Sequence, residues 1–303
     1  MTIPIHRPRA RCLLPVMFVM LAACADTSPP PSPTGKKVAG EATVLAVDLH
    51  RDHGWAAIRK ENYQQAQRYF SQVLKERKED AEAILGLGEA YLGLNRLDDA
   101  RTQFTRIGDQ APPLRRARAL QGLGIAWLRQ GDSEQAKTLL DQAIQLDPTL
   151  WRAWNGLGRV RDGEQDHVAA RYAFRKAIKL KPRMAFLHNN LGFSLLASGE
   201  PAYAESALNK ALELDPELEV ASANLRLALA LQGRYQAALA GVDPDDKARV
   251  LNNVGYGALL RGDLQKARSL FLDAMQAEPS FFREARRNLA YLESIEAEQD
   301  LAD

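Results

Sequence analysis

The feature that most constrains this chain is a glycine that recurs at a nearly constant interval. Successive members of the series lie 34, 36, 34 and 34 residues apart, at Gly54, Gly88, Gly124, Gly158 and Gly192. Self-similarity at a fixed period of this length is typical of repeat architectures, in which each unit packs only on its neighbours. The chain is therefore predicted to fold as a linear stack of similar repeats.

Each repeat carries the same helical pattern after its glycine. An alanine follows by twelve residues, at Ala66, Ala100, Ala136, Ala170, Ala204 and, after Gly255, Ala267. A large apolar residue comes four residues later, at Phe70, Phe104, Leu140, Phe174, Leu208 and Phe271. This spacing marks one face of a helix, and prolines that cannot continue a helix stop most of these segments. Each repeat is thus predicted to contain two helices joined by a short turn.

Residues 151–184 show the pattern most fully. Their Trp154, Leu157, Gly158, Ala170, Phe174, Ala177 and Pro182 fall at spacings that resemble the signature of the tetratricopeptide repeat (TPR). The resemblance implies an all-α fold, a TPR superhelix (α-solenoid) of helix-turn-helix units. We expect about seven repeats over residues 47–281, and a C-terminal capping helix and tail over residues 282–303.

The sixth repeat, residues 219–247, departs from the pattern. It is shorter than the others, and Arg226 stands where the small residue of the helix crossing is expected. The turn-forming segment Gly241-Val242-Asp243-Pro244 interrupts its second helix. We expect a joint here that changes the direction of the superhelix; drift at a tolerant position is the alternative.

The first 23 residues are predicted to be a lipoprotein signal peptide. Arg7, Arg9 and Arg11 precede an apolar run that ends in Leu21-Ala22-Ala23-Cys24 and is too short to span a bilayer. The last four residues resemble the bacterial lipobox. The resemblance implies lipidation of Cys24 after cleavage, and the following Ala25 implies a periplasm-facing protein on the outer membrane of a diderm bacterium. An uncleaved anchor, or an ordinary signal with an incidental cysteine, is the alternative.

Residues 24–46 are predicted to be the lipidated cysteine and a Pro-rich tether. The segment contains Ser28-Pro29-Pro30-Pro31-Ser32-Pro33 and few large apolar residues. Proline-rich chains are extended and semi-rigid at about 3 Å per residue, so twenty residues would reach about 60 Å. The tether is expected to hold the repeats away from the membrane surface.

Composition excludes several classes of function. Loss of the three signal arginines leaves 37 basic residues against 38 acidic ones, which indicates no nucleic-acid partner. Cys12 and Cys24 are the only cysteines, so the mature body has no thiol for a disulfide or a metal site. Pairs such as Gly86-Leu87-Gly88 recur at the repeat period, and are predicted to be packing glycines of helices instead of a dinucleotide-binding loop. We find no catalytic constellation, and therefore expect no enzyme, metal, cofactor or small-molecule substrate.

The predicted binding surface is a stripe on the first helices of three repeats. By resemblance to TPR proteins, these helices line a concave groove for protein partners. The stripe consists of Arg152, Asn155 and Arg159, then Phe186, Asn189 and Phe193, and finally Arg249, Asn252 and Tyr256. Asparagine amides can bond both groups of a peptide backbone, and aromatic side chains anchor interfaces. The alternatives are that Phe193 packs between repeats, and that Asn190 and Asn253 bond helix to helix.

The order of lipobox, Pro-rich tether and tandem repeats resembles the TadD group of lipoproteins of tight-adherence (Flp) pilus assembly. The segments 189–196 and 252–257, which begin Asn189-Asn190-Leu191-Gly192 and Asn252-Asn253-Val254-Gly255, look like that group. The resemblance implies a scaffold that assembles a Tad/Flp-type pilus secretion apparatus, with pilus assembly or secretin components as partners. A pilotin of the type IV pilus secretin, and an adaptor that recruits envelope proteases or peptidoglycan enzymes, are the alternatives.

Overall fold

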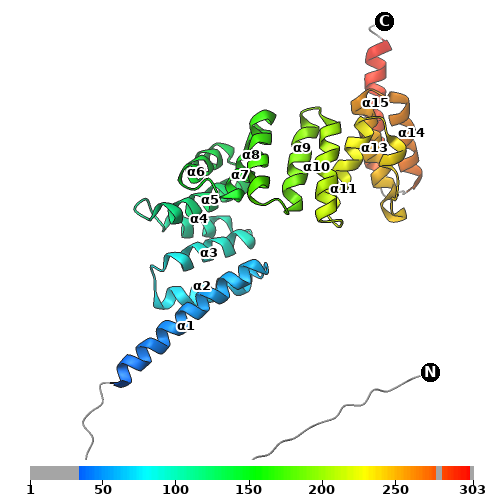
Figure 1. Ribbon diagram of the computed structural model, residues 1–303. Helices are drawn as coiled ribbons and strands as arrows, with labels where there is room; N and C mark the ends of the chain where they lie inside the picture. Colours follow the sequence, from blue (N-terminus) through cyan, green and yellow to red (C-terminus); the bar gives the residue numbers. More distant parts are fainter. Residues whose placement is uncertain (1–33, 278–281, 301–303) are drawn as a thin grey trace, which may run out of the picture. The chain divides into compact units, whose positions relative to one another are not determined.

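The computed structural model describes residues 34–277 and 282–300, and Figure 1 shows that they form paired helices in chain order. Within these residues the secondary structure is entirely helical, so the predicted all-α solenoid of helix-turn-helix units is confirmed. The repeats belong to a compact unit over Ala46–Asp303, and the preceding residues form a separate unit that ends at Leu45. None of the described helices is both long and apolar enough to cross a membrane.

The helices alternate between first and second members of each repeat. The first helices are α1 (Thr34–Arg59), α3 (Ala81–Gly93), α5 (Pro113–Gln130), α7 (Trp151–Gly163), α9 (Ala185–Ala197), α11 (Glu219–Leu231) and α13 (Lys247–Arg261). The second helices are α2 (Tyr63–Glu76), α4 (Leu97–Thr105), α6 (Ser133–Leu146), α8 (His167–Leu180), α10 (Pro201–Leu214), α12 (Tyr235–Ala238) and α14 (Leu264–Ala277). A 3-10 turn, Pro244–Asp246, precedes α13, and the chain continues into α15 (Phe282–Asp300).

The predicted tether is partly helical in the structure. Helix α1 begins at Thr34, directly after the last proline of the Pro-rich segment, and its first twelve residues belong to the separate N-terminal unit. Residues such as Ala39, Glu41 and Ala42 favour a helix, and a helix rises only about 1.5 Å per residue. The extended spacer predicted for residues 24–46 is therefore shorter than expected. Cys24 and the signal peptide lie outside the described residues.

Large apolar side chains of the second helices lock neighbouring repeats together. Phe70 of α2 is fully buried, and a Cβ atom added at Gly54 of α1 would lie only 2.6 Å from its ring. A Cβ atom added at Gly86 of α3 would overlap the same ring. Phe104 and Leu140 lie in the same way between glycines of two successive first helices. The prediction that these are packing glycines is confirmed, because only hydrogen leaves room for the inserted ring.

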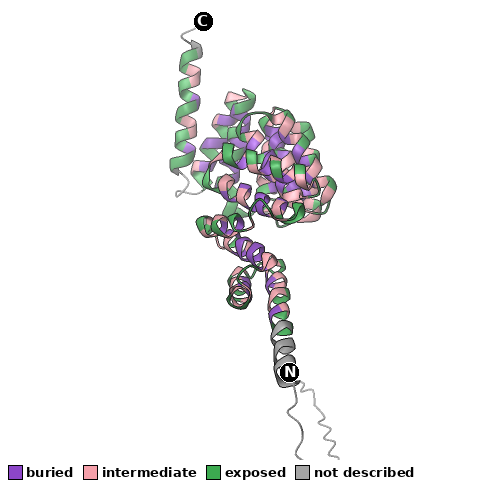
Figure 2. Ribbon diagram, turned by 90° about the vertical axis from the view of Figure 1, so that its left-hand side faces the viewer, coloured by how far each residue is buried: buried purple, intermediate pink, exposed green. Residues whose placement is uncertain are grey.

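The buried residues follow from this interlock. Figure 2 shows them gathered where helices pack against one another, with exposed residues on the outer faces. Small alanines of the second helices, such as Ala170 and Ala204, are completely buried because they lie at the helix crossings. Aspartates at the starts of second helices, such as Asp132 and Asp166, accept backbone N–H bonds and fix where those helices begin.

Packing changes at the sixth repeat. Its second helix, α12, is only four residues long, and Arg226 Nη1 donates to the carbonyl oxygens of Ala238 at 2.5 Å and Ala240 at 3.0 Å. These are carbonyls that a longer helix would have satisfied itself. Helices α11 and α13 therefore pack directly on each other, and a Cβ atom at Gly257 would lie 2.6 Å from the Cβ atom of Ala230. Partial desolvation lowers the pKa of Arg226, and the nearby Arg249 lowers it further.

Candidate functional site

An ion pair on the predicted stripe links two repeats that are not neighbours in the chain. Arg152 Nη1 of α7 lies 2.7 Å from Glu89 Oε2 of α3, so the pair spans the intervening third repeat. The sequence analysis missed Glu89. The signal was present, because Glu89 follows Gly88 just as Arg159 follows Gly158 and therefore occupies the same register of its helix.

Three arginines gather around this ion pair. Arg129, near the end of α5, donates from Nη1 to the carbonyl oxygen of Leu92 at 2.6 Å. Partial desolvation lowers the pKa of Arg129, and repulsion from Arg152 and Arg159 lowers it further. Arginine stays protonated despite such shifts. Neither Arg129 nor Arg159 forms an ion pair with a described residue, so this surface keeps uncompensated positive charge.

Phe193 lies beside the arginines and is open to solvent. Its side chain is 53% exposed, and it lines a pocket of about 440 Å³ together with Arg159, Asn190 and Phe174. It therefore does not pack between repeats, which was the alternative for this residue. We call Glu89, Arg129, Arg152, Arg159 and Phe193 the Arg–Phe surface.

An acidic side chain in the same pocket is already engaged. Asp162 Oδ1 accepts a hydrogen bond from Ser194 Oγ at 2.7 Å and lies 3.0 Å from His167 Nδ1. These contacts hold the carboxylate among its neighbours in α8 and α9. Arg159 and Phe193 are therefore the groups of this pocket that are most available to a partner.

Phe186 is placed differently from Phe193. Its ring centroid lies 5.8 Å from that of Trp151 in the preceding repeat, and its side chain is 37% exposed. The contact belongs to the packing between α7 and α9. Phe186 is therefore a weaker candidate for a partner anchor than Phe193.

The asparagine column is used between repeats, which corrects the prediction for it. The Oδ1 atoms of Asn155, Asn189 and Asn252 accept hydrogen bonds of 2.8–2.9 Å from asparagines of the next first helix, namely Asn190, Asn224 and Asn288. Asn189 and Asn252 are also buried. Their amides face each other across neighbouring helices, so the carbonyl groups are not open to a peptide backbone. For Asn190, the helix-to-helix alternative is what the structure shows.

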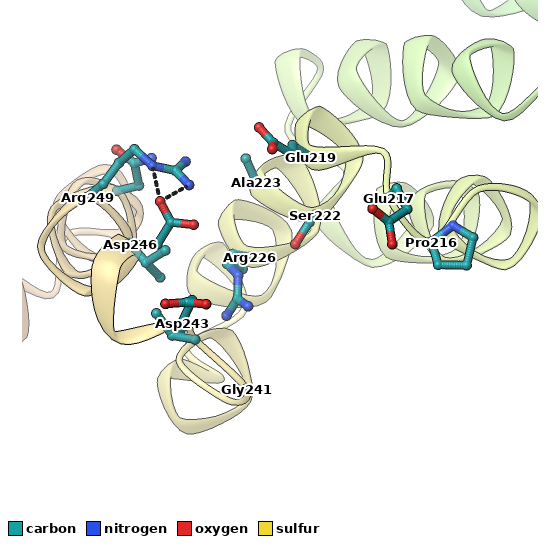
Figure 3. Close-up of a pocket in the computed structure, with 13 residues that line it drawn as sticks. Pro216, Glu217, Glu219, Ser222, Ala223, Arg226, Gly241, Asp243, Asp246 and Arg249 are labelled. Carbon is teal, nitrogen blue, oxygen red and sulfur yellow. Dashed lines mark hydrogen bonds and ion pairs between the residues drawn. The ribbon is translucent and has the colours of Figure 1, made fainter. Parts of the chain in front are cut away.

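The residues predicted in the seventh repeat line two other pockets. Arg249 pairs with Asp246 at 2.8 Å and lines a pocket of about 580 Å³ between α11 and α13, which Figure 3 shows. Tyr256 is 42% exposed and lines a pocket of about 320 Å³ with Asn252. The three groups of predicted residues thus line three pockets.

The histidine that replaces Trp154 in the fifth repeat also replaces its hydrogen bond. Trp154 Nε1 donates to the carbonyl oxygen of Pro148 at 2.9 Å, and His188 Nε2 lies 2.9 Å from that of Pro182. His188 is half-buried, where a buried core histidine was predicted. Among the described residues, no cluster of three or more His, Cys, Asp and Glu side chains is arranged to hold a metal ion.

Comparison with known proteins identifies the repeats. Three models described as tetratricopeptide repeat match residues 57–124, 116–185 and 185–218, and together they span more than half of the chain. The chain is a TPR protein. TPR arrays present extended surfaces to other proteins, and this chain is accordingly a protein-interaction scaffold. No curated protein matches it.

Solved structures show the same fold. A thermophilic TPR protein of Thermus thermophilus is 22% identical with a TM-score of 0.52, and the match covers 64% of this TPR chain and 99% of that chain. The crystal structure of MamA protein is 26% identical with a TM-score of 0.42, covering 57% and 93% of the two chains. The first likeness supports the TPR fold alone.

Proposed function

We propose that this TPR protein is an outer-membrane-anchored, periplasm-facing scaffold for assembly of a Tad/Flp-type pilus secretion apparatus. It binds an acidic segment of a partner protein at the Arg–Phe surface. The observation that carries the binding role is the exposed Phe193 beside Arg159 in one pocket.

The chemistry of the Arg–Phe surface selects the partner. Arg129 and Arg159 offer positive charge without an internal ion pair, and complementary charge speeds association and excludes like-charged partners. An exposed aromatic side chain next to a pocket supplies the apolar contact that dominates binding energy. The expected ligand is therefore a segment that carries carboxylates together with an apolar side chain.

The location rests on the sequence. Leu21-Ala22-Ala23-Cys24 supports lipid attachment, and Ala25 supports outer-membrane sorting. The similarity of residues 189–196 and 252–257 to the tight-adherence lipoproteins supports a pilus machine as the system that is served.

Replacing Phe193 by alanine is expected to abolish capture of pilus assembly or secretin proteins. The measurement is crosslinking of the affinity-tagged, full-length protein in its native envelope, followed by mass spectrometry. Phe193 is exposed, so the melting temperature is expected to fall by less than about 2 °C. Tyr203→Ala is the matched control, because Tyr203 is also exposed but lies on a second helix, α10.

The captured proteins decide between the candidate functions. Tad/Flp assembly proteins that disappear in Phe193→Ala but persist in Tyr203→Ala support the proposal. Capture of only a type IV pilus secretin would replace it by the pilotin function. Capture of proteases or wall hydrolases would replace it by the recruiting adaptor.

Replacing Cys24 by serine is expected to release the protein from the membrane fraction. Serine provides no thiol for lipid attachment, and the removed acyl chains supply the membrane affinity. Fractionation of cells that carry each variant measures the change. Retention of Cys24→Ser in the outer-membrane fraction would contradict lipid anchoring.

A further inference from the structure

Asparagine pairs form a regular bond between neighbouring first helices. The amide nitrogen of the later residue donates to Oδ1 of the earlier one, from Asn190 to Asn155 at 2.9 Å and from Asn224 to Asn189 at 2.9 Å. In both pairs the partners are 35 residues apart, and the donor has the same place in its repeat. A third pair joins α15 to α13.

This bond is missing between α11 and α13. Asn253 precedes Gly255 by two residues, as Asn190 precedes Gly192, so it holds the donor position. The acceptor position on α11, directly before Asn224, is held by Ala223, whose methyl group accepts no hydrogen bond. Asn253 is exposed, and its Nδ2 forms no hydrogen bond with a described residue.

Two pockets meet at the missing bond. Ala223 and Asn253 line both the pocket of about 580 Å³ and the pocket of about 320 Å³. Figure 3 shows Ala223 on α11, facing the space between α11 and the start of α13 in the larger pocket. Both volumes lie in the range of small ligand sites. The short α12 leaves this space open, and the two pockets together form an elongated cleft, which we call the α11–α13 cleft.

The smaller pocket combines amides with apolar surface. Asn224, Asn252, Asn253 and Asn288 line it, together with Leu227 and the exposed Tyr256. Asparagine amides match the donor and acceptor of a peptide group, and an exposed tyrosine beside a leucine accommodates an apolar side chain.

We propose that the α11–α13 cleft is a second binding site, which takes an extended segment of a partner protein. A main-chain carbonyl of that segment accepts from Asn253 Nδ2, in place of the asparagine that α11 lacks. An apolar side chain of the segment packs on Tyr256 and Leu227. The site goes beyond the proposed function, because it shares no residue with the Arg–Phe surface.

The decisive variant is Ala223→Asn, which supplies the missing acceptor. Random dodecapeptides displayed on phage are selected on the full-length protein in detergent, and the recovered peptides are labelled for fluorescence polarisation. Peptides of the cleft are expected to bind Ala223→Asn about tenfold more weakly, because its new side chain occupies Asn253 and fills the cleft. The melting temperature is expected to rise by about 2–4 °C, because a hydrogen bond joins α11 to α13.

Two further variants keep the result unambiguous. Asn253→Ala removes the donor without adding bulk, and should weaken the same peptides by a similar factor. Phe193→Ala should leave them unchanged, whereas it should weaken peptides of the Arg–Phe surface. The proposal is overturned if no recovered peptide is sensitive to Ala223→Asn and Asn253→Ala, or if every recovered peptide depends on Phe193; the second result leaves the proposed function standing.

Discussion

Leucine at position 257 is expected to uncouple the C-terminal helices from the rest of the array. Gly257 of α13 lies against Ala230 of α11, where even a Cβ atom would come within 2.6 Å of the Ala230 Cβ atom. The Ala230 methyl group is fixed to the backbone of α11, so it cannot move aside as the end of a flexible side chain could. Gly257→Leu is expected to lower the free energy of unfolding by about 3 kcal/mol or more, the range of severe overpacking.

Hydrogen exchange should locate this loss. Because repeats contact only their neighbours, protection is expected to fall in α13, α14 and α15 and to persist in α3 to α9. Gly163→Ala is the matched control, since no atom lies within 4 Å of its added Cβ and alanine favours the helix by about 0.5–1 kcal/mol. An unchanged denaturation midpoint for Gly257→Leu would show that α11 and α13 do not depend on this close approach.

The helices and their core could be predicted from the sequence because the information is local and repeated. Ala170, Phe174 and Gly158 have fixed spacings within one repeat, and the interlock of ring and glycine recurs down the chain. One repeat's pattern therefore predicts the packing of the others. The start of α1 was missed because the Pro-rich segment ends at Pro33, and the residues after it carry no apolar periodicity that distinguishes helix from spacer.

The candidate site was predicted only in part, because its contacts join distant residues. Arg152 meets Glu89 across 63 positions, which no spacing rule within a repeat can show. The register of the first helices did identify Arg159 and Phe193 as neighbours on one face. It could not show that the amides of Asn189 and Asn224 would satisfy each other, because that depends on the separation of two helices.

Charge reversal at Arg159 is the sharpest test of the Arg–Phe surface. Arg159→Glu replaces an attraction for an acidic ligand by a repulsion, and is expected to weaken Phe193-dependent acidic peptides about thirtyfold at about 0.05 M salt. The loss should shrink to about threefold at about 1 M salt, where the Debye length is about 3 Å. Fluorescence polarisation of a peptide selected on the full-length protein measures both values.

The same change should not destabilise the fold, which separates binding from stability. Arg159 repels Arg129 and lowers its pKa, so a carboxylate at position 159 is expected to raise that pKa and relieve the repulsion. Arg175→Glu is the control, because Arg175 is exposed on α8 and the variant has the same net charge. Equal weakening by Arg159→Glu and Arg175→Glu would mean that the peptide responds to net charge, and the Arg–Phe surface would then lose its role in selecting the partner.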